Sequence, residues 1–550
     1  MSKASKMSMG MQMGGGLPSL LKDGYKHLSG LEQAILRNTE ACTQLSQITR
    51  TSMGPNGMNK LVVNHLGKII VTSDAATILR ELEVEHPAAK MLVMAADMQD
   101  KEVGDGANLT ATFGGELLSQ AESLLRMGVH PSEVIMGYTM AAAKLQELLP
   151  ELTCHTIANV RDEVELAASI KAVVASKHLG YEDLLSPLVA KACVSVMPPA
   201  PKRAYVNVES VRVAKLIGGS VTDSTVIKGV VVMRDVEGAI SKAEKAKVAV
   251  FGCAMESAST ETKGTIVIKS PEELKAFNKR EERMMEDAVK GLADAGASVV
   301  VVGGSISEIA QHFLDKYNML TIKILSKFEL RRLCKTVGAT AMVRVGPPTA
   351  DELGYADKVS VQDLSSRRVV VFEQFDEESG IATVVLRGST MNLLDDMERA
   401  ITHAANAAKV LCRDGRLLPG AGASEMELAH RIHALGEATP GLEQYAVKKF
   451  AEALESVPRV LAENSGQEAT DVITALYTAH NTGSASAGVD IMGAGTCDAV
   501  EKKIFDNFYT KQSAFRLSCD AALTILRVDQ IIMSKQAGGP KPKAPGAPDM

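Results

Sequence analysis

Residues 103–110 read Val-Gly-Asp-Gly-Ala-Asn-Leu-Thr and lead into an apolar-periodic run to about Arg126, which predicts a glycine loop at the start of a helix. Backbone N–H groups at a helix N-terminus lack partners within the helix, and the helix dipole favours anions, so such a loop can bind phosphate. Asp105 would repel phosphate, and a Mg²⁺ ion between them would resolve the conflict, with Asp105 as an oxygen ligand. By itself, a glycine pair before a helix is more often simple turn chemistry.

Two further glycine loops are predicted at helix starts. Residues 54–57 read Gly-Pro-Asn-Gly, and residues 419–423 read Pro-Gly-Ala-Gly-Ala before an expected helix that carries Glu425 and Glu427. None of the three loops matches a Walker A or a dinucleotide-binding motif, so each alone is weak evidence for a phosphate site.

The pattern of expected helices and strands changes along the chain. From about 18 to 157 the pattern is mostly helical, with a strand-like pair at 61–63 and 69–71 and long helices expected around 87–101, 108–127 and 131–150. From about 223 to 379 strands and helices alternate, with buried strands expected at 230–232, 248–250 and 299–302 and a highly charged helix running from Ser270 towards Gly296. From about 415 the chain is helical again and ends in a strand-like segment at 525–532. A β-rich middle is therefore inserted between two helical halves.

Composition excludes several classes of function. The chain has 550 residues, of which 46% are hydrophobic and 23% charged, so about three or four domains with large cores are expected. The net charge of −6 argues against nucleic acid as the main ligand. The 8 cysteines are scattered without a CxxC pair, which favours a reducing, cytoplasmic compartment over a zinc site or a disulfide scaffold. No apolar run is long enough to cross a bilayer, and residues 1–17 and 536–550 read as disordered tails.

Four segments in this order resemble the signature set of the group II chaperonins: Gly-Pro-Asn-Gly-Met-Asn-Lys at 54–60, Thr-Ser-Asp-Ala-Ala-Thr-Ile-Leu at 72–79, Val-Gly-Asp-Gly at 103–106 and Gly-Ala-Gly-Ala at 420–423. The runs at 86–91, 440–445 and 527–533 narrow the resemblance to one subunit type of the eukaryotic cytosolic chaperonin. The resemblance extends over nearly the whole chain.

The resemblance implies a multidomain fold of mixed α and β structure. It assigns residues 18–157 and 415–535 to a mostly helical equatorial ATP-binding domain, residues 158–222 and 380–414 to a small α/β intermediate hinge domain, and residues 223–379 to an α/β apical substrate-binding domain with a helical lid protrusion at about 255–290. It also implies a double hetero-octameric ring with seven paralogous subunits, in which unfolded client polypeptides fold as ATP turnover closes the lid. A helix around 328–337, with Arg331, Arg332 and Lys335, would face the cavity of the ring.

Carried over position by position, the resemblance implies a site for ATP or ADP with Mg²⁺. Asp105 would bind the metal, and Asp74 would orient the attacking water or the metal shell. The remaining implied residues contact the nucleotide: Met53, Gly54 and Pro55 around base and phosphates, the amides of Gly106, Ala107, Asn108 and Leu109 at the phosphates, Ser176 and Lys177 at the terminal phosphate, Gly422 against the nucleotide, and Asp506 at the ribose with Lys511 nearby. Without the resemblance, a surface salt bridge of Lys177 or a capping role of Asp506 would be equally acceptable.

Several positions depart from the family pattern. Ala107 and Asn108 stand where the family has two threonines, and Ser73, Ala75 and Ala421 also differ from the usual residues.

The largest departure is in the expected helix at about 392–411, where His403 occupies the position of the family's water-activating aspartate. Helical periodicity places Leu393, Met397, Ala400, Ile401, Ala404 and Ala408 on the buried stripe and leaves Asp396, Arg399 and His403 on the other face. Histidine can accept a proton but lacks a fixed negative charge, and losing a positioned general base costs on the order of 10²–10⁴ in rate. Asp395 and Asp396 lie about two turns away and are poor substitutes.

The sequence therefore predicts a chaperonin subunit that binds nucleotide but hydrolyses it slowly or not at all. A compensated, neutral substitution at residue 403 is the simpler alternative. A structural ring subunit with an empty site and a monomeric phosphotransferase are the other readings left open.

Overall fold

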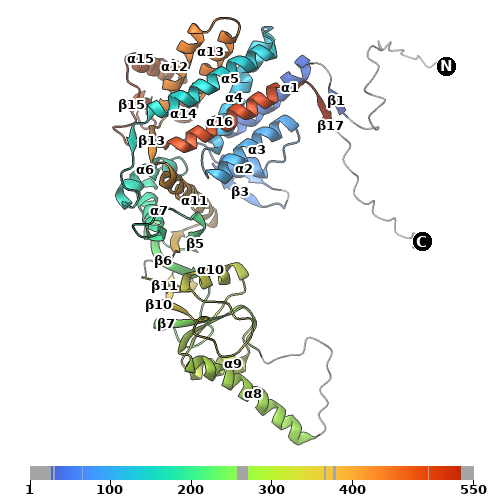
Figure 1. The fold of residues 1–550 in the computed structure, drawn as a ribbon, viewed down its shortest axis with the longest axis vertical. Coiled ribbons are helices and arrows are strands. Elements are labelled where there is room, and N and C mark those ends of the chain that lie inside the picture. The colour runs from blue at the N-terminus through green and yellow to red at the C-terminus, as the bar shows by residue number, and fades with distance from the viewer. Residues whose placement is uncertain are drawn as a thin grey trace, which may run out of the picture.

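The computed structural model describes residues 26–28, 31–64, 66–256, 270–364, 367–375, 380–493 and 495–533. Both predicted tails and residues 257–269 of the expected protrusion lie outside the described residues. The molecule is elongated: helices fill one end, a thinner layer of helices and strands follows, and a sheet with helices forms the other end (Figure 1). We call these parts the helical body, the middle layer and the sheet body.

The helical body combines helices from both ends of the chain (Figure 1). Phe113 lies at its centre, with ring centroids 5.7 Å from Phe450 and 5.4 Å from Phe515 in edge-to-face contacts. One continuous hydrophobic core includes buried residues from Ile35 to Leu152 and from Leu418 to Leu526. The helices of the helical body are α1 (Leu31–Arg50), α2 (Ala75–Glu81), α3 (Pro87–Glu102), α4 (Ala107–Arg126), α5 (Pro131–Leu148), α12 (Ala423–Ala438), α13 (Glu443–Leu454), α14 (Ser456–Asn464), α15 (Ala469–Asn481) and α16 (Phe508–Leu526), with the short 3-10 helix η1 (Leu149–Leu152).

Sequence signals at the helix starts explain several of these boundaries. Pro87 and Pro131 occupy the first helical positions of α3 and α5, where the missing N–H has no partner to lose. Small residues then let helices approach closely: a Cβ on Gly137 of α5 would collide with Ala446 of α13. The helices predicted at 87–101, 108–127 and 131–150 are confirmed.

The helical end of the molecule also contains several short strands. The predicted pair is the antiparallel hairpin of β2 (Lys60–Val63) and β3 (Ile69–Thr72). The segment predicted as a strand at 525–532 is largely wrong, because Ile525 and Leu526 are fully buried in the last turn of α16. A short apolar run does not by itself distinguish a buried helix end from a strand. The other short strands are β1 (Lys26–Leu28) paired with β17 (Ile531–Met533), β4 (His155–Thr156), β13 (Arg416–Pro419) and β16 (Phe505–Asn507) in one sheet, and β14 (Ala487–Val489) paired with β15 (Thr496–Asp498).

The middle layer packs three helices beside the end of the large sheet. A second core joins buried residues between Ile157 and Val221 to others between Ala382 and Leu417, so this layer is also built from two separate stretches. Its elements are α6 (Glu163–Ala175), α7 (Glu182–Val196), α11 (Met391–Arg413), η2 (Val208–Ser210), η3 (Val221–Asp223), β5 (Val211–Ile217) and β12 (Ala382–Gly388).

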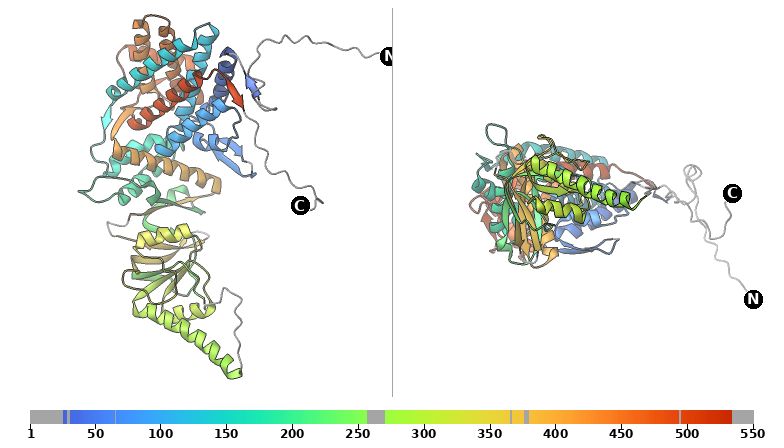
Figure 2. Two further views of the ribbon diagram at one scale, coloured as in Figure 1. Left: turned by 45° about the vertical axis from the view of Figure 1, so that its right-hand side comes forward. Right: turned by 90° about the horizontal axis from the view of Figure 1, so that it is seen from below.

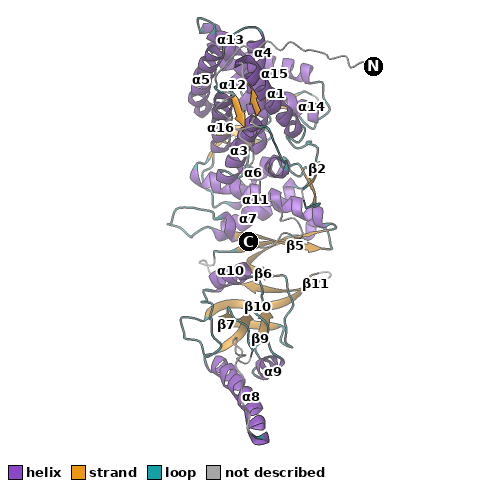
Figure 3. Cartoon of the chain, turned by 90° about the vertical axis from the view of Figure 1, so that its right-hand side faces the viewer, coloured by secondary structure: helices purple, strands orange, loops and turns teal. Residues whose placement is uncertain are grey.

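The sheet body continues this sheet (Figures 2 and 3). Its eight strands run in the order β5-β12-β6-β11-β10-β7-β8-β9. Strand β8 is buried on both faces, which explains its run of four valines at 299–302. All three predicted strands are present, but Val230 and Val231 in β6 are only half-buried, whereas 248–250 and 299–302 are fully buried. The fold class of mixed helix and sheet with a mostly helical part is confirmed. The remaining elements are β6 (Thr225–Val232), β7 (Lys242–Phe251), β8 (Ala297–Val302), β9 (Leu320–Lys323), β10 (Gly354–Leu364), β11 (Arg367–Glu373), α8 (Pro271–Asp294), α9 (Glu308–Lys316) and α10 (Lys327–Val337).

Candidate functional site

A cavity of about 320 Å³ lies where the middle layer meets the helical body. Segments that are far apart in the sequence meet there: the end of α1, the loops before α2, α4 and α12, the end of α6, and α11. Every residue that the sequence assigned to the site lines this cavity, namely Met53, Gly54, Pro55, Asp74, Asp105, Gly106, Ala107, Asn108, Leu109, Ser176, Lys177, His403, Gly422, Asp506 and Lys511.

Two helices begin at the cavity with a left-handed glycine. Gly106 caps α4 with φ +83°, and Gly422 caps α12 with φ +78°, a conformation that glycine adopts without penalty. Neither cap has a side-chain hydrogen bond. The first amide of α12, that of Ala423, donates to the Gly420 carbonyl at 3.0 Å. Among the described residues, the amides of Ala107 to Leu109 in α4 and those of Ser424 and Glu425 in α12 have no protein partner and remain available to a ligand. The two loops therefore present the anion-binding helix ends that the sequence predicts.

The third glycine loop differs from the prediction. Residues 54–57 lie between the end of α1 and strand β2, so they do not open a helix. The Nδ2 atom of Asn108 donates to the Thr49 carbonyl and to Ser52 Oγ, both at 3.2 Å, and thereby ties the chain before this loop to α4. The side-chain amide of Asn108, which stands where the family has a threonine, is therefore bound to the protein itself.

A cluster of charged groups lies at the wall formed by α6 and α11. Asp74 Oδ1 is 3.2 Å from Lys177 Nζ and 3.4 Å from His403 Nε2. Burial by itself would raise the pKa of Asp74, but Lys177, His403 and the hydrogen bonds from Thr77 hold this pKa well below its usual range. Burial likewise would lower the pKa of Lys177, and the negative charges of Asp74 and Asp105 outweigh it and raise this pKa. Asp74 is therefore an ionised carboxylate beside a permanent cation.

The Asp105 carboxylate suits a divalent cation. It lines the cavity, and within the part of the chain that the structure describes it makes no hydrogen bond or ion pair with protein groups. Its backbone carbonyl accepts from Gln99 Nε2 at 2.9 Å, and the same amide donates to the Thr510 carbonyl at 3.2 Å. Gln99 thus fixes the loop against α16 while the carboxylate stays free, and a free carboxylate is a donor that Mg²⁺ accepts together with water and phosphate oxygens.

Three charged groups, of which Lys511 and Glu425 are buried and Asp506 is half-buried, form another wall of the cavity. Lys511 Nζ lies 2.8 Å from Glu425 Oε1 and 2.8 Å from Asp506 Oδ2. Burial alone would lower the pKa of Lys511, but the two carboxylates raise it above its usual value. Glu425 is 1% exposed, so its charge depends on this lysine.

The sequence did not indicate Glu425 or Gln99 as site residues, and of the apolar wall it indicated only Met53 and Leu109. The wall groups Met53 with Val457 and Val460, against which Leu109 and Leu461 pack. Such a surface suits the flat face of a nucleobase. No local sequence pattern identifies these residues as part of a site. Only an expected proximity of α12 and α16 to the loop at 103–106 could have indicated Glu425.

The prediction for α11 needs a correction. Leu394, rather than Leu393, is fully buried, and the face expected to be open is covered, because Asp396 is 8% and His403 7% exposed. Loop 72–74 and the turn at 176–178 lie over this face and contact both side chains. Periodicity identified one packed face, whereas α11 has two.

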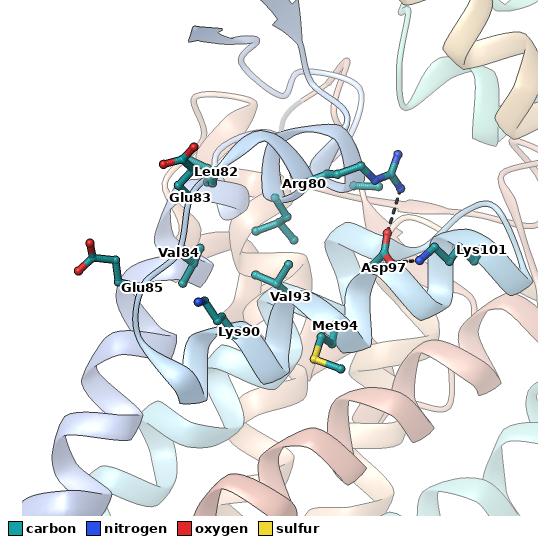
Figure 4. A pocket seen from close by; sticks show the side chains of 12 residues that line it. Arg80, Leu82, Glu83, Val84, Glu85, Lys90, Val93, Met94, Asp97 and Lys101 are labelled. Atoms are coloured by element: carbon teal, nitrogen blue, oxygen red, sulfur yellow. Dashed lines mark hydrogen bonds and ion pairs between the residues drawn. The ribbon is translucent and has the colours of Figure 1, made fainter. Parts of the chain in front are cut away.

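A second cavity, of about 640 Å³, lies between α2 and α3 and holds none of the predicted site residues. Its floor is apolar, with Val84 and Val93, and Asp97 forms ion pairs with Arg80 and Lys101 at its rim (Figure 4). None of the three glycine loops lines this cavity. The first cavity, with free amides and a free carboxylate, is therefore the candidate site.

Comparison with known proteins agrees with the fold. The profile of the TCP-1/cpn60 chaperonin family matches residues 45–536. The chain belongs to this family. It is 51% identical over 529 residues to T-complex protein 1 subunit theta of Bos taurus, with 96% of each chain covered. It is 49% identical to the same subunit of Arabidopsis thaliana and 48% identical to that of Dictyostelium discoideum, which the alignment covers to 96% and 99%.

The match explains the architecture of this chaperonin chain. Chaperonin relatives of nearly the same length cover it, so both helical halves and the inserted sheet body belong to one family fold. Within the described ranges, no helix combines the length and hydropathy that crossing a membrane requires.

Proposed function

We propose that this chain is an ATP-binding subunit of a hetero-oligomeric chaperonin that folds other polypeptides. The observation that carries the proposal is the convergence of all predicted nucleotide residues on one cavity between the helical body and the middle layer. Membership of the chaperonin family supports the same conclusion. A monomeric phosphotransferase has no support from either finding.

In this proposal, different residues bind different parts of the nucleotide. The N-terminal amides of α4 and α12 hold the phosphates, and Lys177 contacts the terminal phosphate. Asp105 holds Mg²⁺, which shields phosphate charge when it is bound. Asp506 accepts from the ribose hydroxyls, and the apolar wall around Met53 packs on the base.

We also propose that hydrolysis by this subunit is slow. His403 stands where the family has its water-activating aspartate, and at the cavity wall its Nε2 atom lies 3.4 Å from Asp74. Its Nδ1 atom is buried without a hydrogen-bond partner. Neither nitrogen is therefore placed to take a proton from water at the terminal phosphate. A ring subunit that binds nucleotide without turnover is the second candidate, favoured by this same arrangement.

Exposed apolar surface supports assembly into a ring with paralogous subunits. The hairpin of β2 and β3 exposes Leu61, Val63, Leu66 and Ile69, which an isolated protein would leave in water. The relatives are named as subunits of a T-complex protein, which fits this reading. In the sheet body, exposed Phe328 on α10 is suited to contact unfolded client polypeptides. All eight cysteines are unpaired, which fits the cytoplasm.

Nucleotide binding can be tested by calorimetric titration of the full-length chain with ADP and Mg²⁺. Unaltered protein should bind, and Asp105→Asn should weaken the binding by removing the metal ligand. Asp100→Asn, which changes a half-buried carboxylate paired with Arg80 outside the cavity, is the matched control. Absence of binding by the unaltered chain would contradict the proposal.

Assembly can be tested by measuring the native mass of the complex isolated with this chain. A ring predicts a mass many times that of one chain, which is 58.4 kDa. A monomeric mass in the native source would contradict the ring.

A further inference from the structure

A second polar cluster lies directly behind the charged cluster at Asp74. Its centre is Asp396 of α11, which accepts from Thr72 Oγ1 at 3.0 Å and lies 3.2 Å from His178 Nε2. Arg399 Nη1 also lies 3.4 Å from Asp396. Neither Asp396 nor His178 lines the nucleotide cavity.

The two clusters are connected through neighbouring residues in the chain. Thr72 Oγ1, which donates to Asp396, also accepts from the backbone N–H of Asp74 at 3.0 Å. His178 directly follows Lys177, and both belong to the turn at the end of α6. Asp396 therefore contacts Thr72, which lies two residues before Asp74, and His178, which directly follows Lys177.

We propose that His178 and Asp396 are positioning residues that fix the turn at 176–178 and the loop at 72–74 against α11, so that Lys177 reaches the terminal phosphate of a bound nucleoside triphosphate. This inference rests on the proposed nucleotide site. A lysine side chain has four rotatable bonds, so its ammonium is placed reproducibly only if the backbone beneath it is fixed.

Burial and charge support this role. The side chains of His178 and Asp396 are 12% and 11% exposed, and a carboxylate with so little water depends on its protein partners. Asp396 also acts on the lysine through space. Burial would lower the pKa of Lys177, and Asp74, Asp105 and, to a smaller extent, Asp396 raise it. The imidazole contact in this conformation is short but not aligned as a hydrogen bond, so His178 acts by packing closely against the carboxylate.

The experiment compares two nucleotides that differ only at the end of the phosphate chain. The affinities of the full-length chain for AMP-PNP and for ADP, each with Mg²⁺, are measured for Lys177→Ala, His178→Ala and the double variant. We expect Lys177→Ala to weaken AMP-PNP selectively, and His178→Ala to weaken it about five- to tenfold with ADP unchanged. The double variant should be no weaker than Lys177→Ala, because His178 acts only through that lysine.

Conservative variants separate positioning from general damage. His178→Gln keeps a polar group that can contact Asp396 and should restore most of the AMP-PNP affinity. Thr72→Val removes the other contact of Asp396 at nearly constant volume and should show the same selective loss, so it replaces His178→Ala if that variant does not fold. Asp395→Asn changes the adjacent carboxylate, which pairs with Lys215 instead, and should leave both affinities unchanged.

The outcomes distinguish the two proposals. Equal weakening of ADP and AMP-PNP by His178→Ala, or additive losses in the double variant, would overturn the positioning role. If the unaltered chain binds neither nucleotide, the proposed function itself fails.

Discussion

The Nδ1 atom of His480 lies 2.7 Å from Oε2 of Glu427, and the opposite ring nitrogen of His480 lies 2.9 Å from the carbonyl oxygen of Ala487. Both partners can only accept hydrogen bonds, so the ring satisfies both contacts when it carries two protons. The histidine is 4% exposed, and this pair joins α12 to α15 behind the nucleotide cavity. A buried imidazole–carboxylate contact therefore ties α12, whose N-cap is Gly422, to α15.

His480→Ala should destabilise the protein by about 3 kcal/mol, because it leaves a buried carboxylate with only Arg431 as partner. His433→Ala is the matched control: this exposed histidine lies 3.8 Å from Glu437, and its loss should cost less than about 0.5 kcal/mol. Urea titration of both variants measures the free energy of unfolding. An equal loss of unfolding free energy in the two variants would contradict a stabilising role of the buried pair.

The same pair predicts a dependence of stability on pH. The hydrogen bond from His480, aided by Arg431, lowers the pKa of Glu427 to about 2 from 4.5. Because the folded-state pKa is depressed, the stabilisation is complete above pH 4.5 and is lost as the pH falls from 4.5 towards 2. In Glu427→Gln this acid-induced loss should be smaller, which acid titration followed by circular dichroism can measure. An unchanged acid transition would contradict the assignment.

His403→Asp should accelerate ATP hydrolysis by at least about tenfold in single-turnover measurements, because it restores a carboxylate at the position of the family base. His403→Asn, which removes the imidazole without adding a charge, is the control and should give no gain. If the aspartate variant is no faster than the unaltered chain, His403 is not what limits hydrolysis.

Gly104→Ala should destabilise the loop that carries Asp105. Gly104 has φ +79°, and a Cβ there would collide with the side chain of Asn406 on α11. Gly128 has φ +92° but open space around it, so Gly128→Ala isolates the conformational cost, about 1 kcal/mol. Gly104→Ala should cost about 2 kcal/mol more and weaken ADP binding. Adding Asn406→Ala should recover part of both losses, and no recovery would contradict the steric explanation.

Lys511→Met should cost about 3–5 kcal/mol, because it leaves Glu425 buried without its cation. Lys502→Met removes another lysine that lines the cavity, but this lysine is exposed in its ion pair with Asp490, so the cost should stay below about 1 kcal/mol. Thermal unfolding of the two variants compares them directly. Similar shifts in melting temperature would mean that Glu425 relaxes towards water.

Local sequence signals predicted the local structure well. Pro87 and Pro131 marked helix starts, the loop containing Gly106 opened α4, and the valines at 299–302 formed a buried strand. Each of these signals acts within a few residues, through a fixed φ, a missing N–H or side-chain periodicity, so the sequence alone carries it. The site residues were predicted from the resemblance of four ordered motifs to the chaperonin signature, and in the structure these residues line one cavity.

What the sequence could not determine depends on contacts between distant segments. Periodicity left His403 and Asp396 on an open face of α11, but a loop about 320 residues earlier in the chain covers them, as the Thr72–Asp396 contact demonstrates. Glu425 and the apolar wall around Met53 entered the site for the same reason. The sequence determined the helices, strands and exposed helix ends. Only the tertiary structure decided which charges face each other, because electrostatic pairing depends on distances that chain folding sets.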